Sequence, residues 1–171
     1  DADLGLQGSD LRAAERTFQL MRQVAGRAGR AEKPGVALLQ TYQPEHPVIR
    51  AILSGDEEGF WQAEADERRA AGMPPYGRLA GVILSSTEVQ EVFDLGNAMA
   101  RQDAPLRRIG AQVYGPAPAP VARVRGRHRV RLLVKAPKGV ALQPALAEWA
   151  AQFRLRGELR MAIDIDPQSF F

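Results

Sequence analysis

The 171-residue sequence contains no cysteine, so neither a disulfide nor a cysteine-ligated zinc site can form within it. No apolar run approaches the ~18 residues that a membrane-spanning helix needs. We therefore expect a soluble, cytoplasmic protein that makes no contact with a membrane. No Gly-x-x-x-x-Gly-Lys-Ser/Thr loop occurs either, which excludes a complete ATPase of the P-loop class. His46 has no partner at metal-ligand spacing, so no metal site is expected.

The positive charge is concentrated in the second half of the chain. Residues 1–75 contain 9 Lys and Arg against 12 Asp and Glu, whereas residues 76–171 contain 14 against 8. A basic surface for an anionic partner therefore belongs to the second half. The length allows one or two small domains. Because the first residue is Asp1 rather than Met, we expect a fragment of a longer protein.

The first candidate site lies at the end of a helix predicted over about residues 10–28. Gln23, Arg27 and Arg30 are spaced at i, i+4 and i+7, which places them on one helical face. Guanidinium groups present a planar fork that matches phosphate oxygens, and glycines between the arginines let a phosphate approach closely. The alternative is a helix C-terminus whose basic residues only complement the helix dipole.

After this helix, the pattern predicts one strand and two helices, over residues 36–42, 47–53 and 57–71. A helix followed by a buried strand fits the closing edge of a RecA-like α/β lobe. We expect His46 to be a turn or cap residue and Asp56 to cap a helix. Phe60 and Trp61 are expected to pack in a core or between domains, with stacking on nucleic-acid bases as the alternative that the acidic surroundings disfavour.

The pattern changes after Pro74-Pro-Tyr-Gly77, a stiff connector that no helix can cross. Strands and helices then alternate as βαββαβ, over residues 79–85, 88–102, 109–114, 129–135, 144–153 and 159–165. This order is that of the split ferredoxin-like arrangement, an antiparallel sheet with two helices on one face. The predicted fold class is therefore α/β in the first part and α+β in the second.

A basic hairpin is predicted between the two middle strands of this domain. A proline-rich segment leads into alternating arginines, namely Arg123, Arg125, Arg127, Arg129 and Arg131. Alternate residues of an extended chain point to one side, although a turn at Gly126 interrupts the register. Five like charges need counter-charge, which a nucleic-acid backbone supplies. Two alternatives stay open: a solvated basic face, or ion pairs with Glu88, Glu91 and Asp94 of the preceding helix.

Few side chains near this hairpin are suited to reading bases. Lys135 extends the basic set, and Tyr76 and Tyr114 are the only nearby aromatic residues that could stack. Two tyrosines fall short of an RNA-recognition sheet with its aromatic pairs. Recognition of phosphates and of fork shape therefore fits better than sequence readout.

The segment Gln23-Val-Ala-Gly-Arg-Ala-Gly-Arg30 resembles the Gln-x-x-Gly-Arg-x-x-Arg element, the last motif of superfamily 2 helicases. Five further segments resemble the bacterial primosomal replication-restart DNA helicases, and the resemblance runs essentially from end to end: Asp1-Ala-Asp-Leu-Gly-Leu6, Gln40-Thr-Tyr-Gln-Pro-Glu-His-Pro47, Gly72-Met-Pro-Pro75, Gly115-Pro-Ala-Pro-Ala-Pro120 and Asp164-Ile-Asp-Pro167. The resemblance implies three parts. Residues 1–45 would end the second RecA-like lobe, 46–75 would be a helical connector, and 76–171 a ribosomal-protein-like C-terminal DNA-binding domain.

The resemblance also implies an ATP-dependent 3′–5′ helicase as the full-length protein. In such motors the arginines reach across the cleft between two lobes, so Arg27 and Arg30 would contact the ATP γ-phosphate and Gln23 would orient the phosphate or Arg27. ATP and Mg²⁺ would be bound by the full-length protein, and this chain alone would bind neither and be inactive. The zinc of the family would lie outside this chain.

The implied partners are forked or branched DNA, other primosome proteins and the acidic tail of single-strand DNA-binding protein, at a nucleoid-associated location. Lys135 and Lys138 would meet that tail, although Gly139 stands where a basic residue is expected. Without an exposed heptad seam, a monomer is the default. Two other hypotheses remain: a non-catalytic DNA-binding scaffold with a vestigial helicase motif, and an RNA-binding module of ribosomal type.

Overall fold

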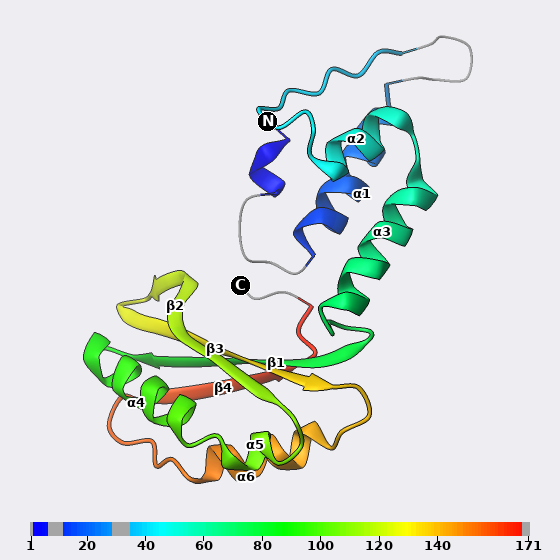
Figure 1. Cartoon of the computed structure of the whole chain (residues 1–171). Helices are drawn as coiled ribbons and strands as arrows, with labels where there is room; N and C mark the ends of the chain where they lie inside the picture. The colour runs from blue at the N-terminus through cyan, green and yellow to red at the C-terminus, as the bar shows by residue number, and fades with distance from the viewer. Residues whose placement is uncertain (1, 7–11, 29–34, 169–171) are drawn as a thin grey trace. The chain divides into compact units, whose positions relative to one another are not determined.

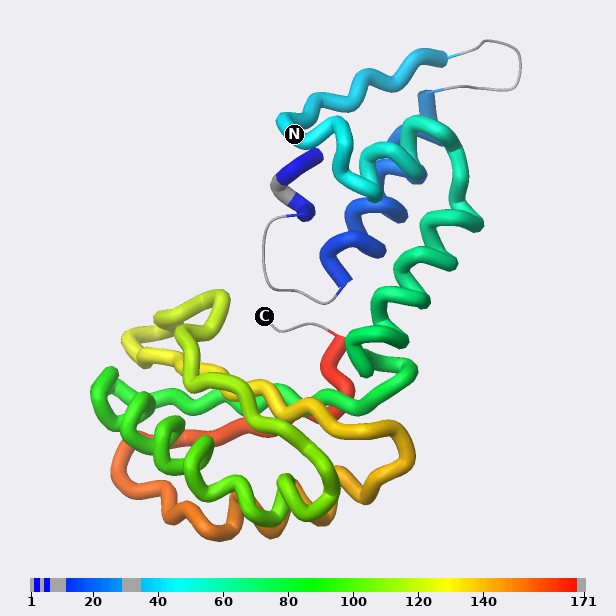
Figure 2. The backbone as a smooth tube through the Cα atoms, in the orientation of Figure 1, coloured from blue at the N-terminus to red at the C-terminus, as the bar shows by residue number. Residues whose placement is uncertain are grey.

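The computed structural model describes residues 2–6, 12–28 and 35–168, and its chain path is shown in Figures 1 and 2. The chain divides into two compact units, Asp1–Asp66 (unit 1) and Glu67–Phe171 (unit 2). No helix within the described ranges is long and apolar enough to cross a membrane. The three-part division expected from the sequence stays a prediction.

Unit 1 contains short helices around a small aromatic core. They are the 3-10 helix η1 (Asp3–Gly5), α1 (Ala13–Ala25), α2 (Pro47–Ser54) and most of α3 (Glu57–Ala70). Phe18 and Phe60 are buried and stack with ring centroids 4.1 Å apart, and Trp61 meets both rings edge-on. Val48 of α2 is buried in the same cluster. The core role predicted for Phe60 and Trp61 is confirmed.

The helices α2 and α3 begin at the capping residues that the sequence predicts. Nδ1 of His46 accepts a hydrogen bond from the backbone N–H of Val48 at 3.3 Å, and Pro47 occupies the first helical position. Oδ1 of Asp56 accepts a hydrogen bond from the N–H of Gly59 at 2.9 Å. Both caps satisfy N–H groups that the first turn of a helix leaves without a partner.

The prediction of a strand over residues 36–42 is wrong, because residues 35–42 lie in no helix or strand. Among the described residues no strand pairs with this segment, so its backbone has no ladder to join. Its apolar side chains are exposed as well, Val36 by 83% and Leu38 by 94%.

Asp3 holds the end of this segment. Its buried carboxylate accepts hydrogen bonds from Oγ1 of Thr41 at 2.5 Å and from the backbone N–H of Tyr42 at 2.7 Å. Both bonds favour the charged form, so they lower the pKa of Asp3 below its ordinary value, with the Thr41 hydroxyl contributing most. The negative charge of Asp3 is therefore part of the native structure of unit 1.

Unit 2 consists of a four-stranded antiparallel sheet with helices on one face (Figure 1). Its elements are β1 (Gly77–Ser86), α4 (Val89–Arg101), α5 (Ala104–Arg107), β2 (Gln112–Val124), β3 (Arg127–Pro137), α6 (Leu142–Ala151) and β4 (Arg160–Ile165). The strand order is β2-β3-β1-β4, and every neighbouring pair is antiparallel. The predicted α+β class and antiparallel sheet are confirmed, whereas the sequence did not predict the short helix α5.

The core of unit 2 lies between the sheet and its helices. Trp149 of α6 is fully buried, and its Nε1 donates a hydrogen bond to the backbone oxygen of Met99 at 3.1 Å, which ties α6 to α4. Gly96 of α4 lies against Pro116 of β2, where a Cβ at position 96 would stand 2.8 Å from the proline Cβ. The absence of a side chain at Gly96 thus allows the helix to approach the proline-rich strand closely.

β2 continues through the proline-rich segment, past residue 114 where the sequence predicted a strand end. It is an edge strand, so prolines without an N–H do not interrupt pairing on its outer side. Its register with β3 shifts twice along this segment. The hairpin closes through Arg125-Gly126, with φ of 48° and 79°, the positive values that a two-residue hairpin turn requires. The predicted turn at Gly126 is confirmed.

Candidate nucleic-acid interface

The basic side chains of β3 lie on the open face of the sheet, the face opposite α4, α5 and α6. Burial alternates along β3, and its helix-facing residues are buried, namely Val130, Leu132, Val134 and Ala136. Because successive side chains of a strand point to opposite faces, Arg127, Arg129, Arg131 and Lys135 share the open face. The one-sided arrangement that the sequence predicts therefore holds for the β3 part of the arginine run.

The register of the central strand β1 extends this face to β4. Ser85 pairs with Arg129 of β3 on one side and with Arg160 of β4 on the other. Residues paired across an antiparallel sheet point to the same face, so Arg160 joins the basic set. The pattern of residues around Arg160 does not show which strand lies beside it, so its place in this set follows only from the pairing of β4 with β1.

Lys135 and Tyr114 lie together at the other end of β3. The Lys135 Nζ lies 5.8 Å from the centroid of the Tyr114 ring and 3.4 Å from the backbone oxygen of Ala71. The Tyr114 side chain is exposed, and its hydroxyl donates to Oε1 of Gln112 at 2.6 Å. Lys135 and Tyr114, both predicted to bind DNA, thus lie in contact with each other. The DNA-binding role of their surface stays a prediction.

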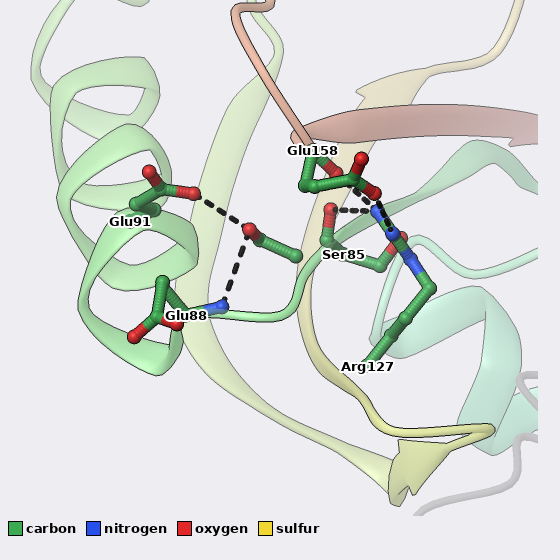
Figure 3. Close-up of polar contacts among 6 residues, drawn as sticks. Ser85, Glu88, Glu91, Arg127 and Glu158 are labelled. Atoms are coloured by element: carbon green, nitrogen blue, oxygen red, sulfur yellow. Dashed lines mark hydrogen bonds and ion pairs between the residues drawn. The ribbon is translucent and has the colours of Figure 1, made fainter.

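The side chain of Arg127 is held by contacts within unit 2. Its side chain is only 18% exposed, and its Nη1 lies 2.8 Å from Oε2 of Glu158 (Figure 3). Its Nη2 donates to the backbone oxygen of Ser85 at 3.1 Å and to the backbone oxygen of Glu158. Arg127 therefore joins β3 to β1 and to the loop that precedes β4, a set of contacts that we call the Arg127 clamp.

The acidic residues of α4 bond to their own neighbours. Oγ of Ser86 donates to Oε2 of Glu91 at 2.6 Å and accepts from the N–H of Glu88 at 3.3 Å (Figure 3). Asp94 accepts from the Gln90 side chain at 2.9 Å. The ion pair that the structure shows for Arg127 is thus made with Glu158, which the sequence did not predict because the two residues are 31 positions apart.

The tip of the hairpin is basic and exposed. Arg123 and Arg125 are both exposed, and neither forms an ion pair with any residue in the described part of the chain. Lys138 is exposed in the loop that follows β3, beside Gly139 with φ of 90°. These side chains are available to an external anion.

The other predicted site lies in unit 1 and is only partly described. Gln23 is exposed on α1, where it borders a shallow depression of the same helix with Arg16, Gln19 and Leu20. Arg27 is exposed in the turn after α1, and its N–H bonds to the oxygen of Val24 at 3.1 Å. Arg30 lies outside the described residues.

Comparison with known proteins identifies a family whose matched region nearly coincides with unit 2. The family model described as "Primosomal protein N C-terminal domain" matches residues 69–168, which is more than half of the chain and nearly all of unit 2. The chain belongs to this family. The replication restart protein PriA of Rickettsia felis is 40% identical to it over all 171 residues, and PriA of Treponema pallidum is 37% identical over 166 residues.

These PriA relatives are longer than the chain. Its 171 residues cover 26% of the Rickettsia felis protein, and 169 residues cover 21% of PriA of Bacillus subtilis at 35% identity. The chain therefore corresponds to about a quarter of a PriA protein. In the described ranges no group of three or more His, Cys, Asp or Glu residues is arranged to hold a metal ion.

Proposed function

We propose that this PriA-family chain is the C-terminal part of a replication-restart DNA helicase that binds branched DNA at stalled forks and supports primosome assembly. The observation that carries the proposal is the basic surface of unit 2, formed by the hairpin tip and the open sheet face. Its phosphate-binding residues would be Arg123, Arg125, Arg129, Arg131 and Lys135. Arginine and lysine on one face are the electrostatic footprint of a protein that binds nucleic acid through its backbone.

The topology of unit 2 supports a split ferredoxin-like domain of ribosomal-protein type. β1 and β2 both run antiparallel to β3, which lies between them, and α4 links β1 to β2 in the chain. Unit 1 would be the end of a RecA-like lobe. The exposed apolar side chains of Leu20, Val24 and Val36 are consistent with packing against further parts of a longer protein.

In that longer protein, Arg27 and Arg30 would contact the phosphates of ATP, with Gln23 orienting the phosphate or Arg27. Gln23 and Arg27 are exposed at the end of a helix, and the guanidinium group suits phosphate oxygens in geometry and charge. ATP with Mg²⁺ would supply the phosphoryl group that is hydrolysed. The arginines would stabilise the charge that develops on the γ-phosphate.

We expect Arg27→Ala in the full-length protein to lower ATP hydrolysis by ~10³-fold or more, with fork binding nearly unchanged. Arg50→Ala is the matched control, since Arg50 is an exposed arginine of unit 1 that pairs only weakly with Glu45 at 3.7 Å. Turnover in Arg27→Ala equal to that of Arg50→Ala would contradict the role of Arg27. If the unmodified full-length protein hydrolyses no ATP, the scaffold hypothesis replaces the motor.

Protein partners of unit 2 would include other primosome proteins and the acidic tail of single-strand DNA-binding protein. Lys138, exposed at the start of the β3–α6 loop, would meet carboxylates of such a tail. A labelled acidic peptide should bind the chain with an affinity that falls with salt and falls further in Lys138→Ala.

Fluorescence anisotropy with labelled DNA tests the central proposal. The 171-residue chain should bind forked DNA more tightly than duplex RNA of equal length. The variant Arg123→Ala/Arg125→Ala/Arg129→Ala should weaken binding and reduce the salt slope by about 2 to 3, since each phosphate contact on duplex DNA contributes ~0.9. The control Arg101→Ala removes an exposed arginine from α4, on the helical side of the sheet.

Three outcomes separate the hypotheses. The DNA surface is supported if the triple variant binds DNA more weakly and with a lower salt slope while the control Arg101→Ala is unchanged. Equal binding by the triple variant and the control would mean that the hairpin is a solvated face. Tighter binding of duplex RNA would favour the RNA-binding module instead.

A further inference from the structure

We propose that Arg160 completes an anion-binding row across the open sheet face, and that a single DNA strand lies on this row with one base against Tyr114. The inference rests on the proposed DNA binding of unit 2 and specifies the strand form and the residues involved. It follows from the register of β1, which pairs with β3 on one side and with β4 on the other.

The row runs from β4 to β3 across Ser85. Because Ser85 pairs with both arginines and strands are about 4.8 Å apart, the Cα atoms of Arg129 and Arg160 are about 10 Å apart on one face. Arg160 is exposed and Arg129 is half-buried, and the Arg127 side chain contacts Ser85 between them. Neither arginine forms an ion pair with a residue in the described ranges. Two unpaired cations at this spacing can contact successive phosphates of one strand.

The carboxylates near Arg160 are either paired or distant, so the hairpin end of the open face is positively charged. Glu158 is the carboxylate nearest in sequence to Arg160 on the loop before β4, and it is paired with Arg127 in the clamp (Figure 3). Asp164 lies on the same face as Arg160 but four residues along β4, about 13 Å away. Glu88 stands at the N-terminus of α4, on the helical side. The hairpin end of the open face is therefore its more positive end, whereas Asp164 lies level with Tyr114 at the opposite edge of the sheet.

Tyr114 supplies a stacking surface on the same face, toward the other end of β3. It pairs with Leu133, which lies two residues along β3 from Arg131 and four residues, about 13 Å, from Arg129 of the row, so a strand that reaches the ring from the row passes Arg131. Its side chain is 46% exposed. A base in a duplex is stacked and paired and cannot reach the ring, whereas a base of a single strand can. The combination of an arginine row with an aromatic ring farther along the same face thus fits single-stranded DNA.

The test measures anisotropy of a labelled oligothymidylate of about 15 nucleotides, and of a duplex of the same length, with the 171-residue chain over a salt series. Arg160→Ala should weaken binding of the single strand and reduce the salt slope by about 0.7, the value for one phosphate contact on single-stranded DNA. Tyr114→Ala should weaken it about 5-fold or more with the slope unchanged, because stacking involves no counterion release. Tyr114→Phe should retain wild-type binding, and Arg101→Ala should change neither quantity.

Trp149 fluorescence of each variant verifies that unit 2 is folded, because this side chain is buried in its core. If Arg129→Ala/Arg131→Ala weakens binding but Arg160→Ala matches the control, the row is wrong while the proposed DNA surface stands. If none of these variants differs from the control, both the row and the proposed surface are wrong. Tighter binding of duplex, with Tyr114→Ala equal to wild type, would overturn the assignment of a single strand.

Discussion

The Arg127 clamp predicts that Arg127→Ala destabilises unit 2 more than any other single change in the arginine run. The substitution leaves the backbone oxygens of Ser85 and Glu158 without their donor and unpairs the Glu158 carboxylate. The part-buried hydrogen bond to Ser85, from a charged donor, contributes about 1.5 to 3 kcal/mol, whereas the bond to the Glu158 backbone is exposed and adds little. The ion pair adds at most about 1 kcal/mol, since Glu158 is 60% exposed and water screens the interaction. We therefore expect a loss of about 2 to 4 kcal/mol in the free energy of unfolding.

Two further variants separate geometry from charge. Arg127→Lys keeps the positive charge but lacks the fork that contacts Ser85 and Glu158 at once, so it should lose about 1 to 2 kcal/mol. Arg123→Ala, at the exposed hairpin tip, should stay within about 0.5 kcal/mol of wild type.

Urea unfolding followed by Trp149 fluorescence provides the measurement. The chain has two tryptophans, so the variants are compared in a Trp61→Phe background in which only unit 2 is reported. An unfolding midpoint for Arg127→Ala equal to that of Arg123→Ala would refute the clamp. If Arg127→Ala instead lowered the salt slope of DNA binding without loss of stability, Arg127 would be a phosphate ligand.

Two other predictions concern the core of unit 2 and the carboxylate of unit 1. Gly96→Ala should destabilise unit 2 by about 1 to 3 kcal/mol, because its Cβ would stand 2.8 Å from that of Pro116; a midpoint in urea equal to wild type would mean that α4 shifts freely. The pKa of Asp3 is lowered, mainly by Thr41, so its stabilising effect is present above its unfolded pKa of about 3.9 and is lost as the pH falls through the lower folded value. Asp3→Asn should therefore unfold at lower urea than wild type at pH 7, with the difference shrinking toward pH 3, as Trp61 fluorescence would report; a constant difference would contradict the charge-based argument.

Local patterns predicted most elements of unit 2. The alternation of apolar and basic residues along β3 defines both a strand and its two faces, and the helical period of α4 defines its core side. Turn chemistry at Gly126 also identified the hairpin. These features depend on neighbours within a few residues, which the sequence shows directly.

Features that depend on distant parts of the chain were not predicted. An apolar run such as residues 36–42 indicates a strand only if a partner strand is present, and none pairs with it in the described ranges. The pairing of Arg127 with Glu158 and the alignment of Arg160 with Ser85 follow from strand order, which sequence spacing does not determine. The sequence pattern therefore groups Arg127 with the other arginines of the run and gives no sign that Arg160 shares their face.

Arg125 has a left-handed backbone, so the residue that adds positive charge to the hairpin tip is not the residue that would stabilise its turn most. Arginine at a φ of 48° is strained by roughly 1 to 2 kcal/mol relative to a residue suited to that region, because its Cβ crowds the following carbonyl oxygen. Asparagine or glycine would relieve this crowding but would remove a guanidinium group from the most exposed point of the hairpin. At position 125 a more stable turn is thus a less cationic one, so engineering for thermostability and engineering for the proposed DNA affinity would select different residues there.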